Sequence, residues 1–205
     1  MIDYEIIGTG SKGNAVRLEN IMIDCGVPFK KMHEALYKCD TLLITHRHSD
    51  HIKESTYFAI RKQFPRIKVY GNSDVAQTVP VDKVIGEKPF QLKRGNITIT
   101  PVMGCHDVDV TYFFIDFDGF KVLYATDTCE IKNPTGDKLD AVFLEANYDE
   151  HILNEVGKQY IRRGYDPFAN ACRHLSLKAC KEFYYGNRRN KDVPLIELHQ
   201  SSRFR

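Results

Sequence analysis

Four side chains that can bind a metal ion lie within six residues of the sequence, at His46, His48, Asp50 and His51. Imidazole and carboxylate groups are the ligands that zinc takes in catalytic sites, where one coordination position stays open for water or substrate. Four ligands are more than one tetrahedral ion needs once that position is open. The spacing therefore predicts two metal ions, with His46 and His48 on one ion and Asp50 and His51 on the other.

The elements around this stretch are expected to hold it at a sharp junction. The apolar run Thr41–Thr45 predicts a buried strand, and Ile52–Phe64 has the apolar spacing of a helix, which Pro65 ends. Between a strand and a helix, successive side chains can turn toward one point. The alternative is a polar helix start, in which Ser49 and Asp50 act as caps and bind no ion.

The histidine-rich stretch, placed after a strand, resembles the H-x-H-x-D-H signature of the metallo-β-lactamase superfamily. This resemblance implies roles for four residues elsewhere in the chain. Asp24 would brace the metal-binding loop from behind, and His106 would be the third ligand of the first ion. Asp127 would bridge both ions, and His199 would complete the second. Taken singly, His106 could instead be a turn residue and Asp127 a helix or turn cap.

Further segments resemble the phosphodiesterases of that superfamily. The opening Gly8–Ala15 is similar to the G-S-G-S-x-G-N opening of YycJ/WalJ-like proteins, which are proposed DNA exonucleases. Residues 144–149 and 173–176 are similar to the E-S/A-N-x-D and G-H-L-S segments of the same group. The ending Leu198–Phe204 is closer to the L-T-H-x-S-x-R-Y pattern of ribonuclease Z. All of these features indicate phosphodiester hydrolysis.

These families imply that His174 is the general acid and that Glu145 orients it. Phosphodiester hydrolysis needs a nucleophile, charge neutralisation and a proton for the leaving alkoxide. A hydroxide that bridges the two metals would be the nucleophile, and Asp50 counts as catalytic because it would hold the second ion. His174 could instead be an ordinary residue before a helix, and Glu145 an exposed charge at the end of a strand.

The substrate is less clearly indicated than the chemistry. The net charge of +2 gives no general attraction to nucleic acid, so phosphate binding must come from local clusters. Weak candidates are four basic residues, for which a solvated helix face is an equal alternative: Lys158, Arg162, Arg163 and Arg173. The first hypothesis is a dinuclear zinc phosphodiesterase that acts on nucleic acid. The alternative is a cyclic-nucleotide phosphodiesterase that resembles phage anti-Pycsar enzymes and degrades a cyclic mononucleotide immune signal. Manganese could replace zinc with these ligands.

The sequence predicts one domain over residues 1–205, of class α/β. The resemblance implies a metallo-β-lactamase-like αββα sandwich, with two mixed sheets between helices. Helices are expected over residues 28–37, 52–64, 73–79, 149–163 and 174–185. Strands are expected over residues 4–8, 15–18, 21–25, 41–45, 67–70, 97–102, 112–117, 121–124, 141–144 and 194–198.

The six cysteines are scattered without a C-x-x-C pair, which favours free thiols over a disulfide framework. Cys105 and Cys129 are interpreted as packing residues, because the histidine and aspartate ligands leave no coordination position vacant. No apolar run approaches the roughly 20 residues of a membrane span. A cytoplasmic protein without a membrane partner is expected (the host cytoplasm, if a phage encodes it). A homodimer is common in the families that this chain resembles.

Overall fold

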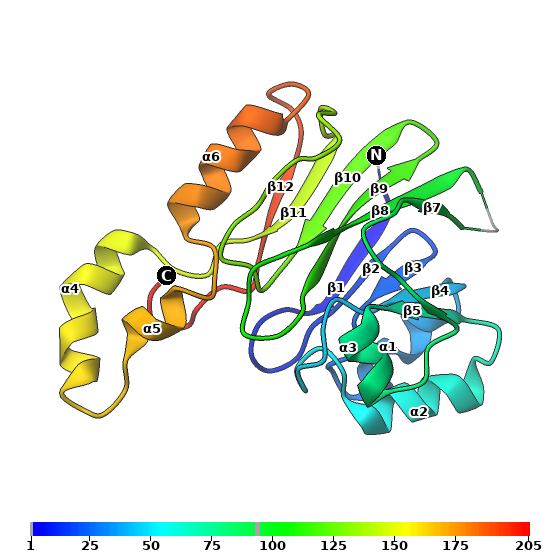
Figure 1. The fold of residues 1–205 in the computed structure, drawn as a ribbon, viewed down its shortest axis with the longest axis horizontal. Helices are drawn as coiled ribbons and strands as arrows, with labels where there is room; N and C mark the ends of the chain where they lie inside the picture. The colour runs from blue at the N-terminus through cyan, green and yellow to red at the C-terminus, as the bar shows by residue number, and fades with distance from the viewer. Residues whose placement is uncertain (1, 93–94) are drawn as a thin grey trace. The chain divides into compact units, whose positions relative to one another are not determined.

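The computed structural model describes residues 2–92 and 95–205, which form two compact units. The first unit comprises Met1–Gly86 and Val108–Thr111, and the second comprises Glu87–Asp107 and Tyr112–Arg205. Within the described residues each unit is built on its own six-stranded sheet. Figure 1 shows the first sheet in blue to cyan and the second in green to red.

The sheet of the first unit is antiparallel at one edge and parallel at the other. Its strand order is β1-β2-β3-β4-β5-β6, in which β1 to β3 are antiparallel neighbours and β3 to β6 are parallel neighbours. The strand bounds are Tyr4–Gly8, Ala15–Leu18, Ile21–Ile23, Thr41–Leu43, Lys68–Gly71 and Lys83–Val84. Since parallel strands need crossovers, a helix follows each of β3, β4 and β5. These helices are α1 (Phe29–Leu36), α2 (Glu54–Gln63) and α3 (Ser73–Thr78).

The three helices cover one face of this sheet. Met32 and Leu36 of α1 and Tyr57 of α2 belong to one buried cluster with Met22 of β3 and Leu42 of β4. The alternate residues of the strands, such as Ile21, Ile23 and Leu43, are also fully buried. Burial on both faces explains why these strands have a continuous apolar sequence instead of an alternating one.

The second unit carries a mixed sheet in the order β12-β11-β10-β9-β8-β7. The bounds of β7 to β12 are Phe90–Gln91, Ile97–Met103, Thr111–Phe117, Phe120–Ala125, Ala141–Glu145 and Leu195–Leu198. β10, β11 and β12 run parallel, while β9 and β10 form an antiparallel hairpin. Asp118 and Gly119 both have positive φ at that hairpin, as a two-residue Asp-Gly turn requires. Helix α6 (Leu177–Asn187) packs Cys180 and Tyr184 onto this sheet.

Helices α4 (Glu150–Ile161) and α5 (Pro167–Ala171) form a hairpin that projects from the second sheet (Figure 1). The hairpin has its own small core, in which Leu153 and Ala171 are buried with Phe204 from the end of the chain. α5 lies outside the helices expected from sequence. Its signal was Asp166-Pro167: the Asp166 side chain accepts hydrogen bonds from the amides of residues 168 and 169, and proline occupies the first helical position.

The mixed α/β class with two mixed sheets and helices is confirmed, and the expected strands and helices fall within a few residues of the observed ones. None of the described helices is long and apolar enough to cross a membrane.

Candidate metal centre

The predicted ligands and catalytic residues fall into two groups, one in each compact unit. The first half-site consists of Asp24, His46, His48, Asp50 and His51. The second half-site consists of His106, Asp127, Glu145, His174 and His199.

The first half-site lies at the carboxyl ends of two parallel strands. Ile23 at the end of β3 pairs with Leu43 at the end of β4, and the amide of Asp24 donates to the carbonyl of Leu43 at 2.8 Å. Asp24 and Thr45 therefore leave the same edge of the sheet. In open α/β sheets this carboxyl edge is where ligand-binding residues gather.

Asp24 is fully buried and holds the loop that follows β4. Its carboxylate accepts hydrogen bonds from the amide of Thr45 at 2.8 Å and the hydroxyl of Thr45 at 3.0 Å. It also lies 2.7 Å from Nδ1 of His51, and Nε2 of that ring lies 3.7 Å from Oδ2 of Asp50. Burial raises the pKa of Asp24, and the His51 and Thr45 contacts offset part of that rise. A buried carboxylate that orients one ring nitrogen leaves the other for a metal ion.

His46 and His48 approach each other closely. Nε2 of His46 lies 3.0 Å from Nδ1 of His48, while Nδ1 of His46 faces the hydroxyl of Thr45 at 3.1 Å. Two imidazole nitrogens that converge in this way fit two ligands of a single ion. The structure thus brings together the pair that the sequence assigns to the first metal.

Asn14, in the loop after β1, supports the same half-site and was not singled out from the sequence. Its amide donates to the carbonyl of Asp50 at 2.7 Å, and its side-chain nitrogen lies 3.2 Å from that carbonyl and 2.9 Å from Nε2 of His51. Asn14 is buried. Asn14 is the last residue of the part of Gly8–Ala15 that resembles G-S-G-S-x-G-N, and its contacts tie this segment to the metal-binding loop.

Gly26 allows the metal-binding loop to approach the end of β3. A Cβ atom added to Gly26 would lie only 1.7 Å from the carbonyl oxygen of Asp50. Gly13 is confined in the same way, because it has φ +127° and its Cβ would lie 2.5 Å from the carbonyl of Gly26. No side chain fits where these three backbone segments meet.

We therefore expect Gly26→Ala to displace the carbonyl of Asp50 and destabilise the first unit. Overpacking of this kind lowers the free energy of unfolding by roughly 1–3 kcal/mol or more. Chemical denaturation would measure the loss. Gly86→Ala is the matched control, because its Cβ would meet no atom within 4 Å. Equal stability of the two variants would contradict the close approach.

The second half-site lies at the carboxyl ends of three parallel strands. Asp127 follows β10, Glu145 ends β11 and His199 follows β12, and these three strands are neighbours in the sheet. Glu145 pairs with Leu198, so the residue after each strand reaches the same edge. The sequence analysis assigned these residues one by one, and the parallel register explains why they meet.

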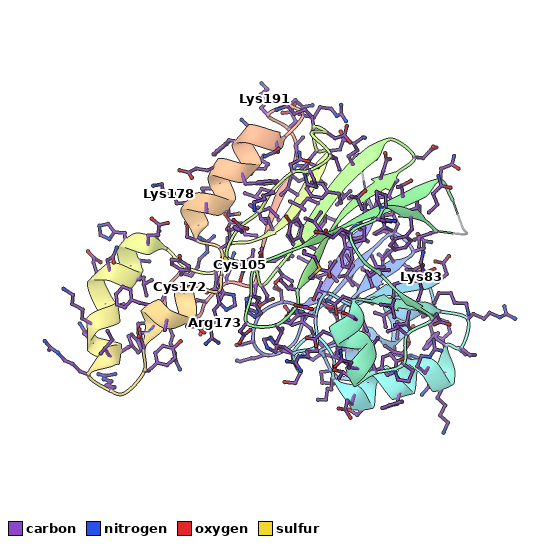
Figure 2. All side chains as sticks on the ribbon, in the orientation of Figure 1. Lys83, Cys105, Cys172, Arg173, Lys178 and Lys191 are labelled. Carbon is purple, nitrogen blue, oxygen red and sulfur yellow. A yellow bond between two sulfur atoms is a disulfide. The ribbon has the colours of Figure 1, made fainter. Side chains whose placement is uncertain are left out.

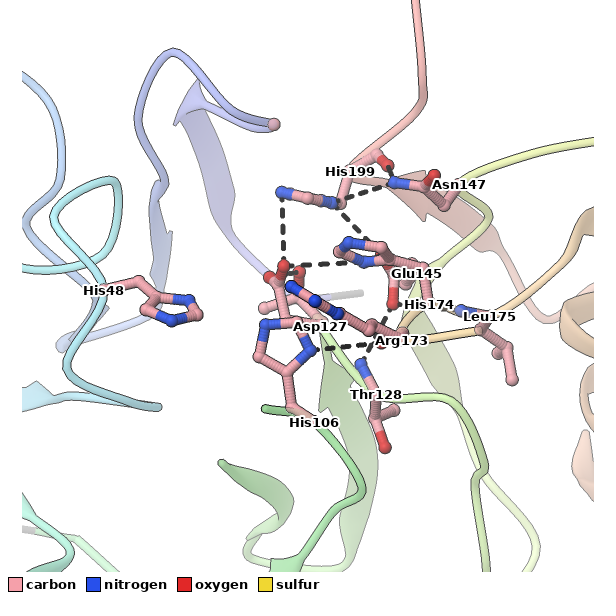
Figure 3. Close-up of polar contacts among 12 residues, drawn as sticks. His48, His106, Asp127, Thr128, Glu145, Asn147, Arg173, His174, Leu175 and His199 are labelled. Atoms are coloured by element: carbon pink, nitrogen blue, oxygen red, sulfur yellow. Dashed lines mark hydrogen bonds and ion pairs between the residues drawn. The ribbon is translucent and has the colours of Figure 1, made fainter. Parts of the chain in front are cut away.

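Glu145 contacts two imidazoles and two backbone amides in the second half-site (Figure 3). Its Oε1 lies 2.7 Å from Nδ1 of His174 and 3.1 Å from Nδ1 of His199. Its Oε2 accepts hydrogen bonds from the amides of Thr128 at 3.1 Å and Leu175 at 3.3 Å. Burial alone raises the pKa of Glu145, but the hydrogen bonds with His174 and His199 outweigh burial and hold the pKa below its ordinary value. A buried anion with this many donors positions both imidazoles.

Contacts with Nδ1 and with the backbone carbonyl orient His199. Nδ1 lies 3.1 Å from Glu145 and 3.1 Å from the side-chain nitrogen of Asn147, which also donates to the carbonyl of His199 at 2.8 Å. Nε2 of His199 consequently faces Asp127, whose Oδ1 lies 3.4 Å away. Asn147 is a supporting residue that the sequence placed only within a motif (Figure 3).

His106 presents one ring nitrogen in the same way. Nδ1 lies 3.1 Å from the carbonyl oxygen of Arg173, and since a carbonyl only accepts, Nδ1 carries the proton. Nε2 lies 3.1 Å from Oδ1 of Asp107, and in the neutral ring it would carry the lone pair that a metal ion needs. Burial lowers the pKa of His106, against the raising effect of Asp127, which favours the neutral ring that ligates metals.

Three residues of the two half-sites have left-handed backbones. Their φ angles are 63° at Asp24, 54° at Asp127 and 48° at His199. This conformation costs free energy in a residue other than glycine and persists where its surroundings enforce it, often at functional sites. Asp24 and His199 come directly after a strand, and Asp127 lies two residues beyond one.

The interpretation of Cys105 and Cys129 as free packing residues is wrong. The two residues form a disulfide with a Cα–Cα distance of 5.3 Å. They lie 24 residues apart in sequence, and the amide of Cys129 donates to the carbonyl of Cys105 at 2.8 Å. Their proximity depends on how the segments after β8 and β10 meet, which residue spacing does not reveal. The other four cysteines are free thiols: Cys25, Cys39, Cys172 and Cys180.

The four basic candidates do not form one cluster. Lys158 lies in the last turn of α4, and Arg162 and Arg163 follow at the end of the hairpin that points away from the second sheet (Figure 1). Arg173 lies beside the second half-site instead (Figure 3), and its guanidinium donates to Asp107 at 2.9 Å. Any joint role of the four would need a substrate that spans the α4–α5 hairpin.

The residues present fit divalent metal ions. In the second half-site, one ligand atom each of Asp127, Glu145, His174 and His199 lies within 4.8 Å of all the others. In the first, the ring nitrogens of His46 and His48 converge, and His51 is oriented by Asp24. Mixed nitrogen and oxygen donors of this kind suit zinc and also tolerate manganese.

Comparison with known proteins places this arrangement in a family. The profile described as "Beta-lactamase superfamily domain" matches residues 19–158, a stretch that includes the whole first half-site and His106, Asp127 and Glu145. Exodeoxyribonuclease WalJ of Streptococcus pneumoniae is 28% identical over 175 residues, which cover 73% of this chain and 64% of that protein. The chain thus spans under two thirds of the length of this relative.

Solved structures share the fold over nearly the whole chain. The metallo-beta-lactamase fold protein YhfI from Bacillus subtilis has a TM-score of 0.72 at 18% identity, covering 98% of this chain and 87% of YhfI. The short form of human tRNase Z has a TM-score of 0.67 at 17% identity, covering 99% of this chain and 94% of that protein. At these identities the similarity concerns the fold alone.

Proposed function

Because this chain belongs to the beta-lactamase superfamily, we propose that it is a metal-dependent phosphodiesterase that hydrolyses nucleic acid. The two half-sites would together bind two divalent ions, most simply zinc, with Asp127 shared between them. The observation that carries this proposal is the pair of imidazoles that Glu145 holds, because hydrolysis of a phosphodiester needs a proton donor beside the metal ligands. The similarity to an exodeoxyribonuclease supports a nucleic-acid substrate.

The ligand set would consist of His46, His48 and His106 on one ion and Asp50, His51 and His199 on the other, with Asp127 common to both. When bound, such ions activate water and neutralise charge on the phosphoryl oxygens. The resemblance that led to this assignment also gives Asp24 its supporting role, and the contact of Asp24 with Nδ1 of His51 is consistent with it.

His174 is the proposed general acid. Its Nδ1 is engaged by Glu145 at 2.7 Å, so Nε2 is the atom from which a proton would pass to the leaving oxygen. Only 9% of the His174 side chain is exposed, compared with 0% for Glu145. A mostly buried imidazole whose far nitrogen is hydrogen-bonded to a carboxylate is oriented for this transfer.

A cyclic-mononucleotide phosphodiesterase is the second candidate. The observation in its favour is the placement of positive charge: Lys158, Arg162 and Arg163 lie at the far end of the α4–α5 hairpin, and Arg173 already pairs with Asp107. A substrate with one phosphate needs little of that charge, whereas a polymer would gain from it.

A hydrolysis panel at several salt concentrations separates the two candidates. Single-stranded DNA, RNA and cyclic mononucleotides would be compared at matched enzyme concentration, with and without a chelator. We expect cleavage of a polymer, abolished by chelation, with an affinity that falls steeply as salt rises because several phosphates release counterions. Rapid hydrolysis of a cyclic mononucleotide without cleavage of DNA or RNA would favour the second candidate.

Neutralising Lys158, Arg162 and Arg163 together is expected to weaken polymer binding and make its salt dependence shallower. Each lost phosphate contact should lower the slope of log K against log salt by about 0.7–0.9. Neutralising Lys30, Lys31 and Lys62, which are exposed in the first unit, is the control with the same change of charge. Identical slopes for both triple variants would show that the hairpin does not contact the substrate.

A further inference from the structure

The Cys105–Cys129 disulfide lies within the second half-site. Cys105 is bonded directly to His106, and Cys129 follows Asp127 by two residues, so the cross-link joins the segments that carry two proposed ligands. Cys105 is exposed and Cys129 is half-buried, which makes the bond accessible to small thiols (Figure 2 labels Cys105). Accessible disulfides are the ones that are most readily reduced.

Hydrogen bonds keep the two cysteines together independently of the covalent bond. The amide of Cys129 donates to the carbonyl of Cys105 at 2.8 Å, and the amide of Cys105 donates to the hydroxyl of Thr128 at 3.0 Å. After reduction these contacts would still hold the two thiols near each other. The disulfide could therefore be reduced and formed again without unfolding of the second unit.

The segment that carries Asp127 is the one that the disulfide constrains. Asp127 has a left-handed backbone, and the hydroxyl of Thr126 donates to its Oδ2 at 2.7 Å. Thr128 is tied on the other side, because its amide donates to Glu145. The cross-link at Cys129, directly after Thr128, restricts the backbone of this strained turn. It limits His106 in the same way, since that residue comes directly after Cys105.

The remaining cysteines are poorly placed for redox chemistry beside the site. Cys25 and Cys180 are buried, and burial raises the pKa of the Cys180 thiol to about 12. Cys39 is half-buried, and burial raises the pKa of its thiol to about 12 as well. Thiols that stay protonated react slowly. Exposed Cys172 is the other accessible thiol among the described residues, and it serves below as a control.

We propose that Cys105 and Cys129 form a reversible redox site that controls how tightly the chain holds metal through His106 and Asp127. In the oxidised state the cross-link keeps His106 and Asp127 in position before the ion arrives. Reduction loosens both, so binding must then order them. The proposal rests on the proposed function in one respect, namely that His106 and Asp127 are metal ligands.

The redox step balances with a disulfide of low molecular weight, such as oxidised glutathione, as the oxidant. One cysteine thiolate attacks a sulfur of oxidised glutathione, forms a mixed disulfide and releases one glutathione. The second cysteine then attacks the protein sulfur of that mixed disulfide and releases the second glutathione. The two thiols lose two protons and two electrons, and one molecule of oxidised glutathione takes them up as two molecules of reduced glutathione.

The test is a metal-binding titration of the full chain in both redox states. Zn²⁺ affinity would be measured by competition with a chromogenic chelator, after equilibration with oxidised or reduced glutathione, and mass spectrometry would confirm the bond. We expect reduction to weaken zinc affinity by about 10–100-fold, the range found when groups that orient ligands are lost. The Cys105→Ser/Cys129→Ser variant should match the reduced protein in both buffers, and Cys172→Ser should respond like the wild type.

Three results would overturn the proposal: equal zinc affinity in both states, no Cys105–Cys129 bond in the oxidising buffer, or tighter binding after reduction. Co²⁺ would reveal the last case, because a thiolate-to-cobalt absorption band would show that the cysteines themselves bind metal. Failure of the proposed function has a different signature. Absence of metal binding in either state would refute the ligand assignment, whereas normal binding and hydrolysis without redox dependence would refute the redox site alone.

Discussion

Asp50→Ala is expected to lose one of two bound metal ions and nearly all turnover while the fold persists. The carboxylate faces Nε2 of His51 at 3.7 Å and is 27% exposed, so it is not part of the buried core. The backbone carbonyl of Asp50, which accepts from Asn14, is retained in the variant. Loss of one electrostatic stabiliser of a transition state typically costs about 10²–10³-fold in rate, and loss of a metal ion should cost at least that much.

Elemental analysis and phosphodiester hydrolysis of the same sample would measure both effects. Asp192→Ala is a suitable control, because Asp192 is an exposed acid in the turn before β12. Circular dichroism and thermal melting should be close to wild type for both variants. Unchanged turnover of Asp50→Ala would mean that Asp50 is not a ligand and that the four donors between His46 and His51 do not serve two ions.

His174→Ala is expected to keep both metal ions but to lower kcat by roughly 10²–10⁴-fold, the usual contribution of a general acid. The physical reason is that Nδ1 of His174 is held by Glu145, which leaves Nε2 to protonate the leaving oxygen. The loss should shrink with a p-nitrophenyl phosphodiester, whose leaving group hardly needs a proton. Kinetics with this ester and with a poor leaving group would give the comparison.

The metal content of His174→Ala separates two roles for this residue. Nδ1 of His174 lies 3.6 Å from Oδ1 of Asp127, close enough for the imidazole to belong to the ligand set. Loss of metal from the variant would therefore assign His174 as a ligand. An equal loss of rate on good and poor leaving groups, with both ions retained, would show that His174 positions the substrate and transfers no proton.

Four candidate donors of the first half-site could be located from the sequence because they lie within six residues of one another. His46, His48, Asp50 and His51 follow one strand, and the apolar run before them identified β4 within two residues. The parallel strands of the first unit were equally visible, because burial on both faces gives continuous apolar runs such as Leu42 and Leu43.

The second half-site could not be derived in this way. His106, Asp127 and His199 are single residues spread over more than ninety positions, and only the resemblance to a family selected them. What brings Asp127 and His199 together is the parallel register of β10, β11 and β12 and two left-handed turns. Residue types alone do not reveal which parallel strands are neighbours, and they do not reveal which aspartate or histidine adopts a positive φ.

The sequence did not identify the supporting residues either, because their roles depend on contacts between distant segments. Asn147 is recognisable only by its contacts with His199, and Gly26 only by the close approach of the Asp50 carbonyl. The Cys105–Cys129 bond contradicts the expectation of free thiols, since cysteines 24 residues apart give no indication of pairing. The short helix α5, by contrast, had a readable signal in Asp166-Pro167.

The metal content of the purified chain tests the central claim most directly. Protein prepared without chelator would be analysed for zinc and manganese by elemental analysis and normalised to protein concentration from amino-acid analysis. With seven ligands in two sets that share Asp127, we expect about two divalent ions per chain, and about one in the Asp50→Ala variant. A well-folded, monodisperse sample that holds at most trace metal, and takes up none on dialysis against Zn²⁺ or Mn²⁺, would contradict a metal-dependent phosphodiesterase.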